Sequence, residues 1–457
     1  MAKESCSERN AFDILKQLEH ILESDPLIIF LYSFLTSSYF AELKCRDEVG
    51  FVHPSQFLAL SGGSDASSQS PVSNVHSTDG ISTTGISEAG VMQYDYTIFW
   101  NRDHKLAIST QVLLPLYKAA MHAFMAVAKE YRMVINLLED TDSFVNESAG
   151  DNSSDSKRIL ENELMRHSKA LLVLSGDFGT AWNSRKLVVS RKESYSLLME
   201  ELQLSALILS YSPKSEHAWS HRRWVVKMIA GKYWNLQELM GKESELVEKI
   251  AEKSRMNYRA WHHRSWLVTY MTKKQVLDEL NESRRWAELH VADNCCFHYR
   301  RRLMLQSLEG NYSKESPSFV FKSELLMVWK EELNWDELLI KRYIGREALW
   351  VHRRFLSQCW INHFMADQSA LCQHSENYNL DSFLNNELQL LHSCLSVSDN
   401  DFEDKGMHAQ LAASYILWIW KLLGREIQEK HKELGELKTI LNKVSPEKAS
   451  LWEALIE

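Results

Sequence analysis

The sequence contains 457 residues, of which 52 are Lys or Arg and 61 are Asp or Glu, so its formal net charge is −9. This acidic balance argues against general nucleic-acid binding, because attachment to a phosphate backbone needs a basic surface. The seven cysteines show no CxxC spacing. They therefore indicate neither a disulfide framework nor a zinc module, and the pattern is typical of a cytoplasmic protein.

The sequence carries no recognisable targeting or catalytic signature. Its first residues lack the basic-then-apolar order of a signal peptide, and the strongest apolar run, 27–35, is too short to span a bilayer. It has no GxxxxGK loop, GxGxxG fingerprint, HExxH or GxSxG motif. We expect no membrane span and no metal or cofactor held by this chain.

The N-terminal third reads as helices interrupted by polar segments. Residues 1–60 are predicted to be helical, with clear periodicity over 11–24 and an extended stretch at 51–54. Residues 61–91 are mostly Ser, Gly, Thr and Asp, which bury too little apolar surface to offset the entropy of ordering, so we predict a disordered linker. Residues 92–138 are predicted to be helical again, and residues 139–157 to form an acidic loop.

Residues 158–424 repeat one short pattern, in which an aromatic residue is followed three places later by Arg. The anchor aromatics are 37, 42, 36 and 53 residues apart, which is typical of stacked helix pairs with an insertion before the last. The five copies are Trp182-Asn-Ser-Arg185, Trp219-Ser-His-Arg222, Trp261-His-His-Arg264, Phe297-His-Tyr-Arg300 and Trp350-Val-His-Arg353.

Each copy is predicted to be a pair of helices. A polar helix comes first, at 194–210, 242–254, 274–292 and 322–344, and the helix with the aromatic residue and Arg follows a tight connection. A last pair, at 380–397 and 407–423, lacks the Arg, as expected of a capping unit, and 425–457 reads as a charged helical tail. The fold class is therefore all-α, an array of antiparallel helix pairs (an alpha-alpha solenoid).

The anchor aromatics are predicted to form the core between helices. Residues three apart share one helix face. An aromatic side chain buries roughly 150–250 Å², worth on the order of 4–6 kcal/mol at about 25 cal/mol per Å² before entropy is subtracted. Burial on this scale favours a core over a cofactor site.

The repeated Arg and His residues allow two interpretations. They could form a basic array that binds phosphate, since Arg makes paired bonds to phosphate oxygens. The favoured interpretation is structural, because Arg recurs in every copy whereas a single ligand needs only one or two. The acids available on the neighbouring helices are Glu200, Glu201, Glu245, Glu248, Asp278, Glu279, Glu331 and Glu332.

The residues on the turns ahead of the anchors differ more from copy to copy than the anchors do. Polar residues on such turns often carry the binding function of a protein. Two stretches of the sequence resemble the repeat of protein prenyltransferase alpha subunits. They are Pro213-Lys214 through Trp219-Ser-His-Arg222-Arg223, and Asn257-Tyr258-Arg259-Ala-Trp261-His-His-Arg264-Ser-Trp266. The likeness covers roughly residues 158–360, and its specificity comes from five ordered copies.

The resemblance implies a right-handed superhelical crescent of helix pairs around a beta subunit that holds the catalytic zinc and most of the isoprenoid pocket. It implies that isoprenoid diphosphate is a co-substrate bound by Lys214, Asn257, Tyr258 and Arg259. Of these, Lys214, Arg259 and Tyr258 are the expected catalytic residues. Arg259 stands where a farnesyltransferase-type chain has His, and Glu216 where it has Tyr.

Two functions are therefore open. The first is the alpha subunit of a heterodimeric protein prenyltransferase, acting on protein cysteines, with relatives that pair with the Rab-type beta subunit and transfer geranylgeranyl. The second is a helical-repeat adaptor that binds a protein partner without catalysis. A purely electrostatic RNA reader is a distant third.

Overall fold

The structure, a computed structural model, describes residues 2–25, 28, 49–54, 56, 98–141, 150–233, 236–309, 319–365, 380–395, 405–423, 437–444, 446 and 449–450. The chain divides into two compact units, which are described separately below. The first comprises Met1–Leu236 with Glu248–Ser254, and the second comprises Gln237–Val247 with Arg255–Glu457.

The first unit begins with three helices, α1 (Ala2–Ser24), α3 (Leu113–Thr141) and α4 (Gly150–Leu174), which pack against one another. Leu18, Leu22 and Phe124 are buried among them. Polar contacts fix the same arrangement, because His167 Nδ1 lies 2.5 Å from Glu19 Oε1 and links α4 to α1. The N-terminal segment is thus part of the packed unit.

A three-stranded sheet lies between α1 and α3 in the sequence, which corrects the helical prediction for the start of 92–138. Strand β3 (Lys105–Ser109) is central, with β1 (Val49–Val52) parallel and β2 (Phe99–Arg102) antiparallel to it. Asp103 and His104 both have positive φ, as a two-residue hairpin turn requires. The helix itself starts only at Leu113, and the extended stretch predicted at 51–54 overlaps β1.

The prediction of an acidic loop over the whole of 139–157 is wrong at both ends, because α3 runs to Thr141 and α4 covers the last part of the range. Residues 142–149 lie outside the described part of the chain, but α4 already begins at Gly150. Asp155 forms an ion pair with Arg158 one turn later, at 3.4 Å, and an acidic residue near a helix N-terminus is favoured by the helix dipole. Acidic residues here start a helix rather than a loop.

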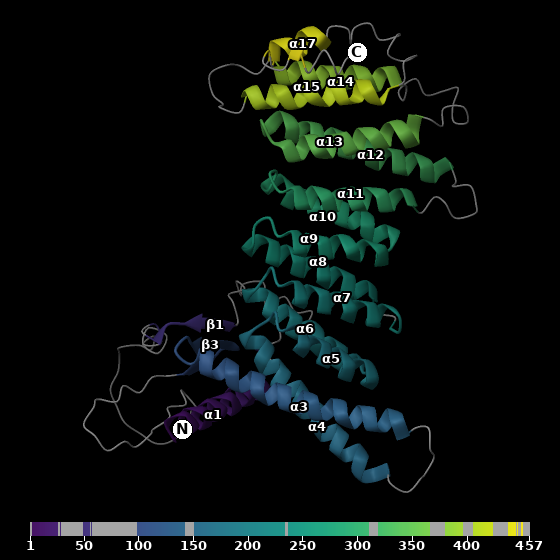
Figure 1. Cartoon of the computed structure of the whole chain (residues 1–457). Helices are drawn as coiled ribbons and strands as arrows, with labels where there is room; N and C mark the ends of the chain where they lie inside the picture. The colour runs from purple at the N-terminus through teal and green to yellow at the C-terminus, as the bar shows by residue number, and fades with distance from the viewer. Residues whose placement is uncertain are drawn as a thin grey trace, which may run out of the picture. The chain divides into compact units, whose positions relative to one another are not determined.

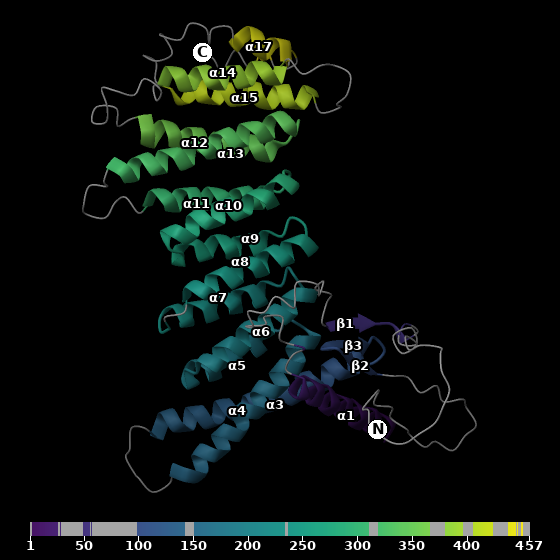
Figure 2. The ribbon, with the colours of Figure 1, turned by 180° about the vertical axis from the view of Figure 1, so that it is seen from behind.

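The rest of the first unit consists of helix pairs in two layers. Helix α5 (Gly179–Lys192) packs on α7 (Glu216–Ala230), and α4 packs on α6 (Tyr195–Tyr211). The sheet lies beside α6 (Figure 2), where Phe51 meets Tyr211 edge-on at 5.9 Å. Helix α8 (Leu236–Lys253) contributes residues to both units.

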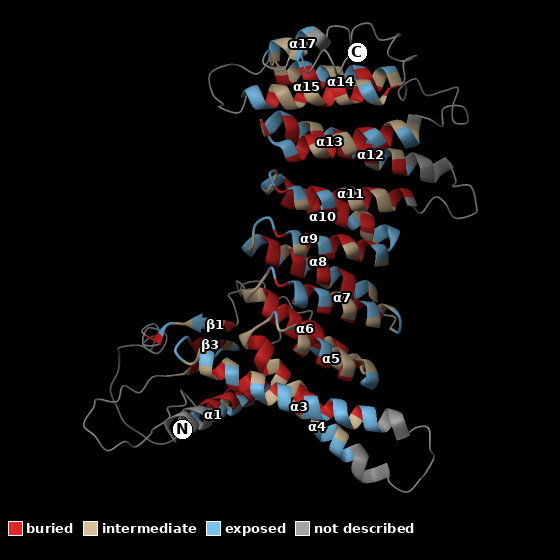
Figure 3. Cartoon of the chain, in the orientation of Figure 1, coloured by how far each residue is buried: buried red, intermediate tan, exposed pale blue. Residues whose placement is uncertain are grey.

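The second unit repeats the same two-layer arrangement (Figure 1). The anchor-bearing helices α9, α11 and α13, followed by α15, pack on one another, and α12 packs on α14 in the other layer. Buried residues follow the faces along which the helices of each pair meet (Figure 3). The elements are α9 (Tyr258–Leu267), η2 (Val268–Tyr270), α10 (Lys273–Leu289), α11 (Asn294–Glu309), α12 (Phe319–Arg342), α13 (Glu347–Trp360), η3 (Ile361–Met365), α14 (Leu380–Leu395), α15 (Lys405–Leu422) and α17 (Leu437–Val444).

The predicted all-α class is confirmed, since helices dominate the described residues and the one sheet found among them is small and not closed. The predicted capping pair corresponds to α14 and α15. The predicted disordered linker at 61–91 lies outside the described residues, as does most of the tail at 425–457 apart from α17.

Replacing Trp261 with Ala is expected to be a folding mutation. Trp261 is 1% exposed and packs on Trp286 at 4.7 Å and Tyr299 at 5.8 Å. Loss of this ring should lower the free energy of unfolding by about 3–5 kcal/mol, whereas Lys214→Ala, at an exposed turn, should change it by less than about 0.5 kcal/mol. Urea unfolding followed by circular dichroism measures both, and equal losses would contradict this assignment.

Candidate functional site

The five anchor aromatics form the core, as predicted. None of Trp182, Trp219, Trp261, Phe297 and Trp350 is more than 2% exposed. Two of them also fix the turn that precedes them, because the indole Nε1 of Trp182 donates to Gly176 O at 2.8 Å and that of Trp219 donates to Pro213 O at 3.0 Å. The anchors therefore hold the turns as well as the helices.

Four anchor arginines, Arg185, Arg264, Arg300 and Arg353, bind buried carboxylates on the neighbouring helix pair. The fifth, Arg222, donates to Leu202 O at 2.6 Å and to Ser205 Oγ at 3.0 Å. Arg185 donates from Nε and Nη2 to Glu201, which is fully buried, and the fully buried His221 donates from Nε2 to the same carboxylate at 2.7 Å. Burial alone would raise the pKa of Glu201, but the charge of Arg185 and the His221 hydrogen bond outweigh it and lower that pKa to about 2.

The same arrangement recurs along the second unit. Glu332 accepts from Arg300 Nε at 2.9 Å and from His352 Nε2 at 3.1 Å. Where the repeat has Tyr in place of His, the phenol hydroxyl makes the corresponding hydrogen bond. Tyr299 donates to the carboxylate of Glu279, which Arg264 also binds. We call Glu201, Glu279, Glu332 and Glu387 the bridging carboxylates, since each joins an anchor Arg to a His or Tyr two helices later.

The bridging histidines are neutral donors. Burial lowers the pKa of both His221 and His352. Among the described residues, the Nδ1 atoms of His221 and His352 are buried without a hydrogen-bond partner, and a protonated ring would leave each of them as an unsatisfied N–H. A neutral imidazole that donates from Nε2 fits the site, and no proton-transfer role is needed to explain these residues.

The structural interpretation of the repeated Arg and His residues is therefore correct, although only part of the acid set was foreseen. Glu201, Glu279 and Glu332 were among the acids considered. Glu243, which lies 2.9 Å from His263, and Glu387, which binds Arg353, were not. A fixed spacing in the sequence could have identified Glu243. In four of the copies, the acid precedes its His or Tyr partner by 20 residues.

The turn that carries Lys214 is held firmly on both sides while the lysine itself is exposed. Its Pro213 neighbour accepts the Trp219 indole hydrogen bond, and Ser215 donates to Asp177 Oδ1 at 2.5 Å and accepts from Ala218 N at 3.3 Å. Ser215 is also the N-cap of α7. The ammonium group is thus displayed from a fixed backbone.

The second predicted turn presents residues of different kinds. Asn257 is 1% exposed and caps α9 by accepting from Ala260 N at 3.2 Å, so its side chain has a structural task. Tyr258 is 64% exposed and stacks on His262, with ring centroids 5.6 Å apart. Arg259 is half-buried. Lys214 belongs to the first compact unit and these three residues to the second.

Comparison with known proteins supports the repeat assignment. The sequence profile described as protein prenyltransferase alpha subunit repeat matches residues 198–229 and 241–271, which include the turns of Lys214 and Tyr258. The human protein prenyltransferase alpha subunit repeat-containing protein 1 is 31% identical over 258 residues, covering 47% of this chain and 63% of the relative.

Two repeats of the chain thus match the protein prenyltransferase alpha subunit repeat, and the chain is similar to proteins named for that repeat. The Danio rerio protein of the same name is 31% identical over 45% of this chain and 57% of its own length. The Xenopus laevis repeat-containing protein 1-A is 26% identical over 63% of this chain and 77% of its own length. This chain thus spans less than two thirds of the length of the human and zebrafish relatives that it matches.

Among the described residues, no group of His, Cys, Asp and Glu side chains is arranged to hold a metal ion. Within the same residues, no helix is both long and apolar enough to cross a membrane. The cysteines that the structure describes in side-chain detail are free thiols, and burial raises the pKa of Cys296 to about 12, so it is a core residue rather than a nucleophile.

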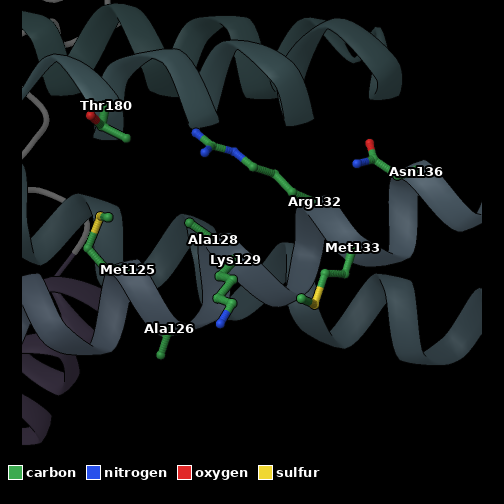
Figure 4. A pocket seen from close by; sticks show the side chains of 8 residues that line it. All are labelled: Met125, Ala126, Ala128, Lys129, Arg132, Met133, Asn136 and Thr180. Atoms are coloured by element: carbon green, nitrogen blue, oxygen red, sulfur yellow. The ribbon is translucent and has the colours of Figure 1, made fainter.

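A cavity of about 560 Å³ lies along α3 of the first unit and contains none of the predicted site residues. Thr180 of α5 contributes to its wall, and in Figure 4 the side chains of Met125 and Arg132 extend from α3 toward the side on which Thr180 lies. The remaining lining residues are Ala126, Ala128, Lys129, Met133 and Asn136.

Glu332→Gln is expected to destabilise the repeat protein strongly. The amide cannot balance the Arg300 charge, which is fully buried. Removing one member of a buried ion pair typically costs about 3–5 kcal/mol. Chemical unfolding of this variant should be compared with that of Glu331→Gln, which removes a carboxylate from an exposed neighbour and should be nearly silent. Equal effects would show that the bridging carboxylate is not important for stability.

The contribution of Glu332 to the free energy of unfolding should also depend on pH, and it should fall on acidification. Its pKa is lowered from 4.5 to about 2 in the folded chain, so its stabilising effect is complete above about pH 4.5 and is lost as the pH falls toward 2. The difference in unfolding free energy between wild type and Glu332→Gln should therefore be constant above that range and shrink below it. A difference that grows on acidification would contradict the ionised, paired state.

Proposed function

We propose that this chain is the alpha subunit of a heterodimeric protein prenyltransferase that transfers geranylgeranyl to protein cysteines in the cytoplasm. In this proposal the chain supplies the scaffold, docks the protein substrate and contacts the diphosphate of the isoprenoid. Its partner is a beta subunit of the type used by Rab geranylgeranyltransferase. The family match and the polar turns of two successive matched repeats support the proposal.

The observation that carries the proposal is the position of the cationic residues relative to the anchors. Lys214 lies five residues before Trp219, on a turn fixed by three hydrogen bonds. Arg259 lies two residues before Trp261 and two residues after the Asn257 cap. The anchor arginines bind groups of the core instead. Lys214 and Arg259 are therefore cations of the matched repeats that lie outside the anchor positions.

The chemistry explains why cations are needed. As the bond between the lipid carbon and the diphosphate breaks, negative charge grows on the diphosphate oxygens, and cations placed there stabilise the transition state more than the ground state. Lys214 and Arg259 would supply that charge, and the exposed Tyr258 hydroxyl would donate a hydrogen bond. Zinc held by the beta subunit would bind the acceptor cysteine as its thiolate.

A non-catalytic adaptor remains the second candidate. The printed names of the relatives describe repeat content and not an activity, and most of the repeated polar residues serve the core. Affinity purification from cytosol with mass spectrometry separates the two. Recovery of a prenyltransferase beta subunit in equal amount supports the first, and consistent recovery of other partners without it supports the adaptor.

Lys214→Ala and Arg259→Ala should each slow prenyl transfer while leaving the complex intact. Loss of one electrostatic contact to a developing charge typically costs on the order of 10²-fold in rate. Single-turnover transfer by the reconstituted heterodimer measures this, with lipid binding expected to change less. Arg255→Ala is the matched control, because this exposed cation lies in the turn before α9 without occupying the repeat position. Unchanged rates in the double variant would leave the chain as a scaffold alone.

A further inference from the structure

Three consecutive arginines on α11 have three different environments. Arg300 is fully buried and saturated by Glu332, Leu280 O and Ser283. Arg302 reaches Gln306 at 3.4 Å. Arg301 is half-buried, and its Nη1 atom is buried without any hydrogen-bond partner among the described residues. No carboxylate in that part of the chain forms an ion pair with it.

Two histidines belong to the same pair of packed helices as Arg301. His298 is three residues earlier on α11, and residues at this spacing share a helix face. Helix α9 packs against α11 and contributes His262, on which Tyr258 stacks. Burial lowers the pKa of His298, and the nearby charges of Arg301 and His262 lower it further, as expected of side chains that face one another with no anion between them.

This arrangement is costly without a ligand. A guanidinium group that is partly removed from water loses hydration, and the loss is recovered only when an anion takes its place. For Arg300 and Arg353 the protein supplies that anion, in the form of Glu332 and Glu387. At Arg301 the described residues supply none, so an anion that pairs with it would come from outside them.

We propose that Arg301, His298 and His262, with Tyr258 at the edge, form a binding site for a phosphate or diphosphate group. The planar guanidinium can bind two oxygens of one phosphoryl group. The two imidazoles and the phenol add up to three donors, which suits a group with several oxygens better than a carboxylate with two. All four residues belong to the second unit, on α9 and α11.

This site deepens the proposed function, because Tyr258 also belongs to the turn where that proposal places a diphosphate contact. It requires, however, only that this face bind a phosphoryl group. Prenyl transfer is not needed for the site to exist. The two proposals can therefore fail separately.

Calorimetric titration of the full chain with inorganic pyrophosphate at low ionic strength tests the site. Arg301→Gln should weaken binding by roughly 10-fold or more, the effect typical of a lost charge-assisted bond, and His298→Asn should weaken it less. Arg302→Gln is the matched control, since it removes the same charge from the next residue and should leave binding nearly unchanged. His298 is exposed, so its variant keeps the test valid if Arg301→Gln fails to fold.

Inorganic phosphate and succinate test which anion the site prefers. Inorganic phosphate should bind more weakly than pyrophosphate, and succinate, a dicarboxylate, more weakly still. The site is refuted if pyrophosphate does not bind, if Arg301→Gln and Arg302→Gln weaken binding equally, or if succinate binds as tightly as pyrophosphate, which would indicate acidic side chains of a partner. If pyrophosphate binding depends on Arg301 but no beta subunit confers transfer, the site stands and the proposed function fails.

Discussion

The structure depends on one recurring interaction, a buried carboxylate shared between two cations or donors from successive helix pairs. Glu201, for example, lies on α6 and is held by Arg185 of α5 and His221 of α7. Removing three polar groups from water is expensive, and the cost is recovered only when all three meet in correct geometry. The interaction therefore specifies the register of neighbouring repeats, whereas the aromatic anchors supply most of the apolar burial.

This arrangement divides the polar residues of the repeat into two groups. The anchor arginines, and the His or Tyr two places after each of the last four anchors, bind groups within the core, where Arg300 and His352 share Glu332. Exposed residues on the turns, and Arg301 beside the anchor arginine Arg300, lie outside these core contacts. Lys214 represents the first kind and Arg301 the second. The candidate chemistry thus lies beside the repeated motif and not within it.

Part of the site could be read from the residues alone and part could not. The offset of Lys214 from its anchor placed it on an exposed turn, and the sequence also indicated Tyr258 and Arg259. Burial of Asn257 as a helix cap was not foreseen, because cap and ligand roles call for the same residue type. The repeat pattern does not distinguish Arg301 from its neighbour Arg302. Neighbouring positions of a helix point in different directions, so identical residues acquire different partners.

The sequence by itself determined the all-α class, the helix pairs and the core aromatics, because periodicity and spacing are local properties repeated five times. It did not determine β2 and β3, since short apolar runs fit a helix or a strand equally well until their neighbours are known. It also could not select Glu387 as the partner of Arg353, 34 residues away. Only the tertiary structure decides which carboxylate a buried arginine meets, because that choice depends on how separate helices pack.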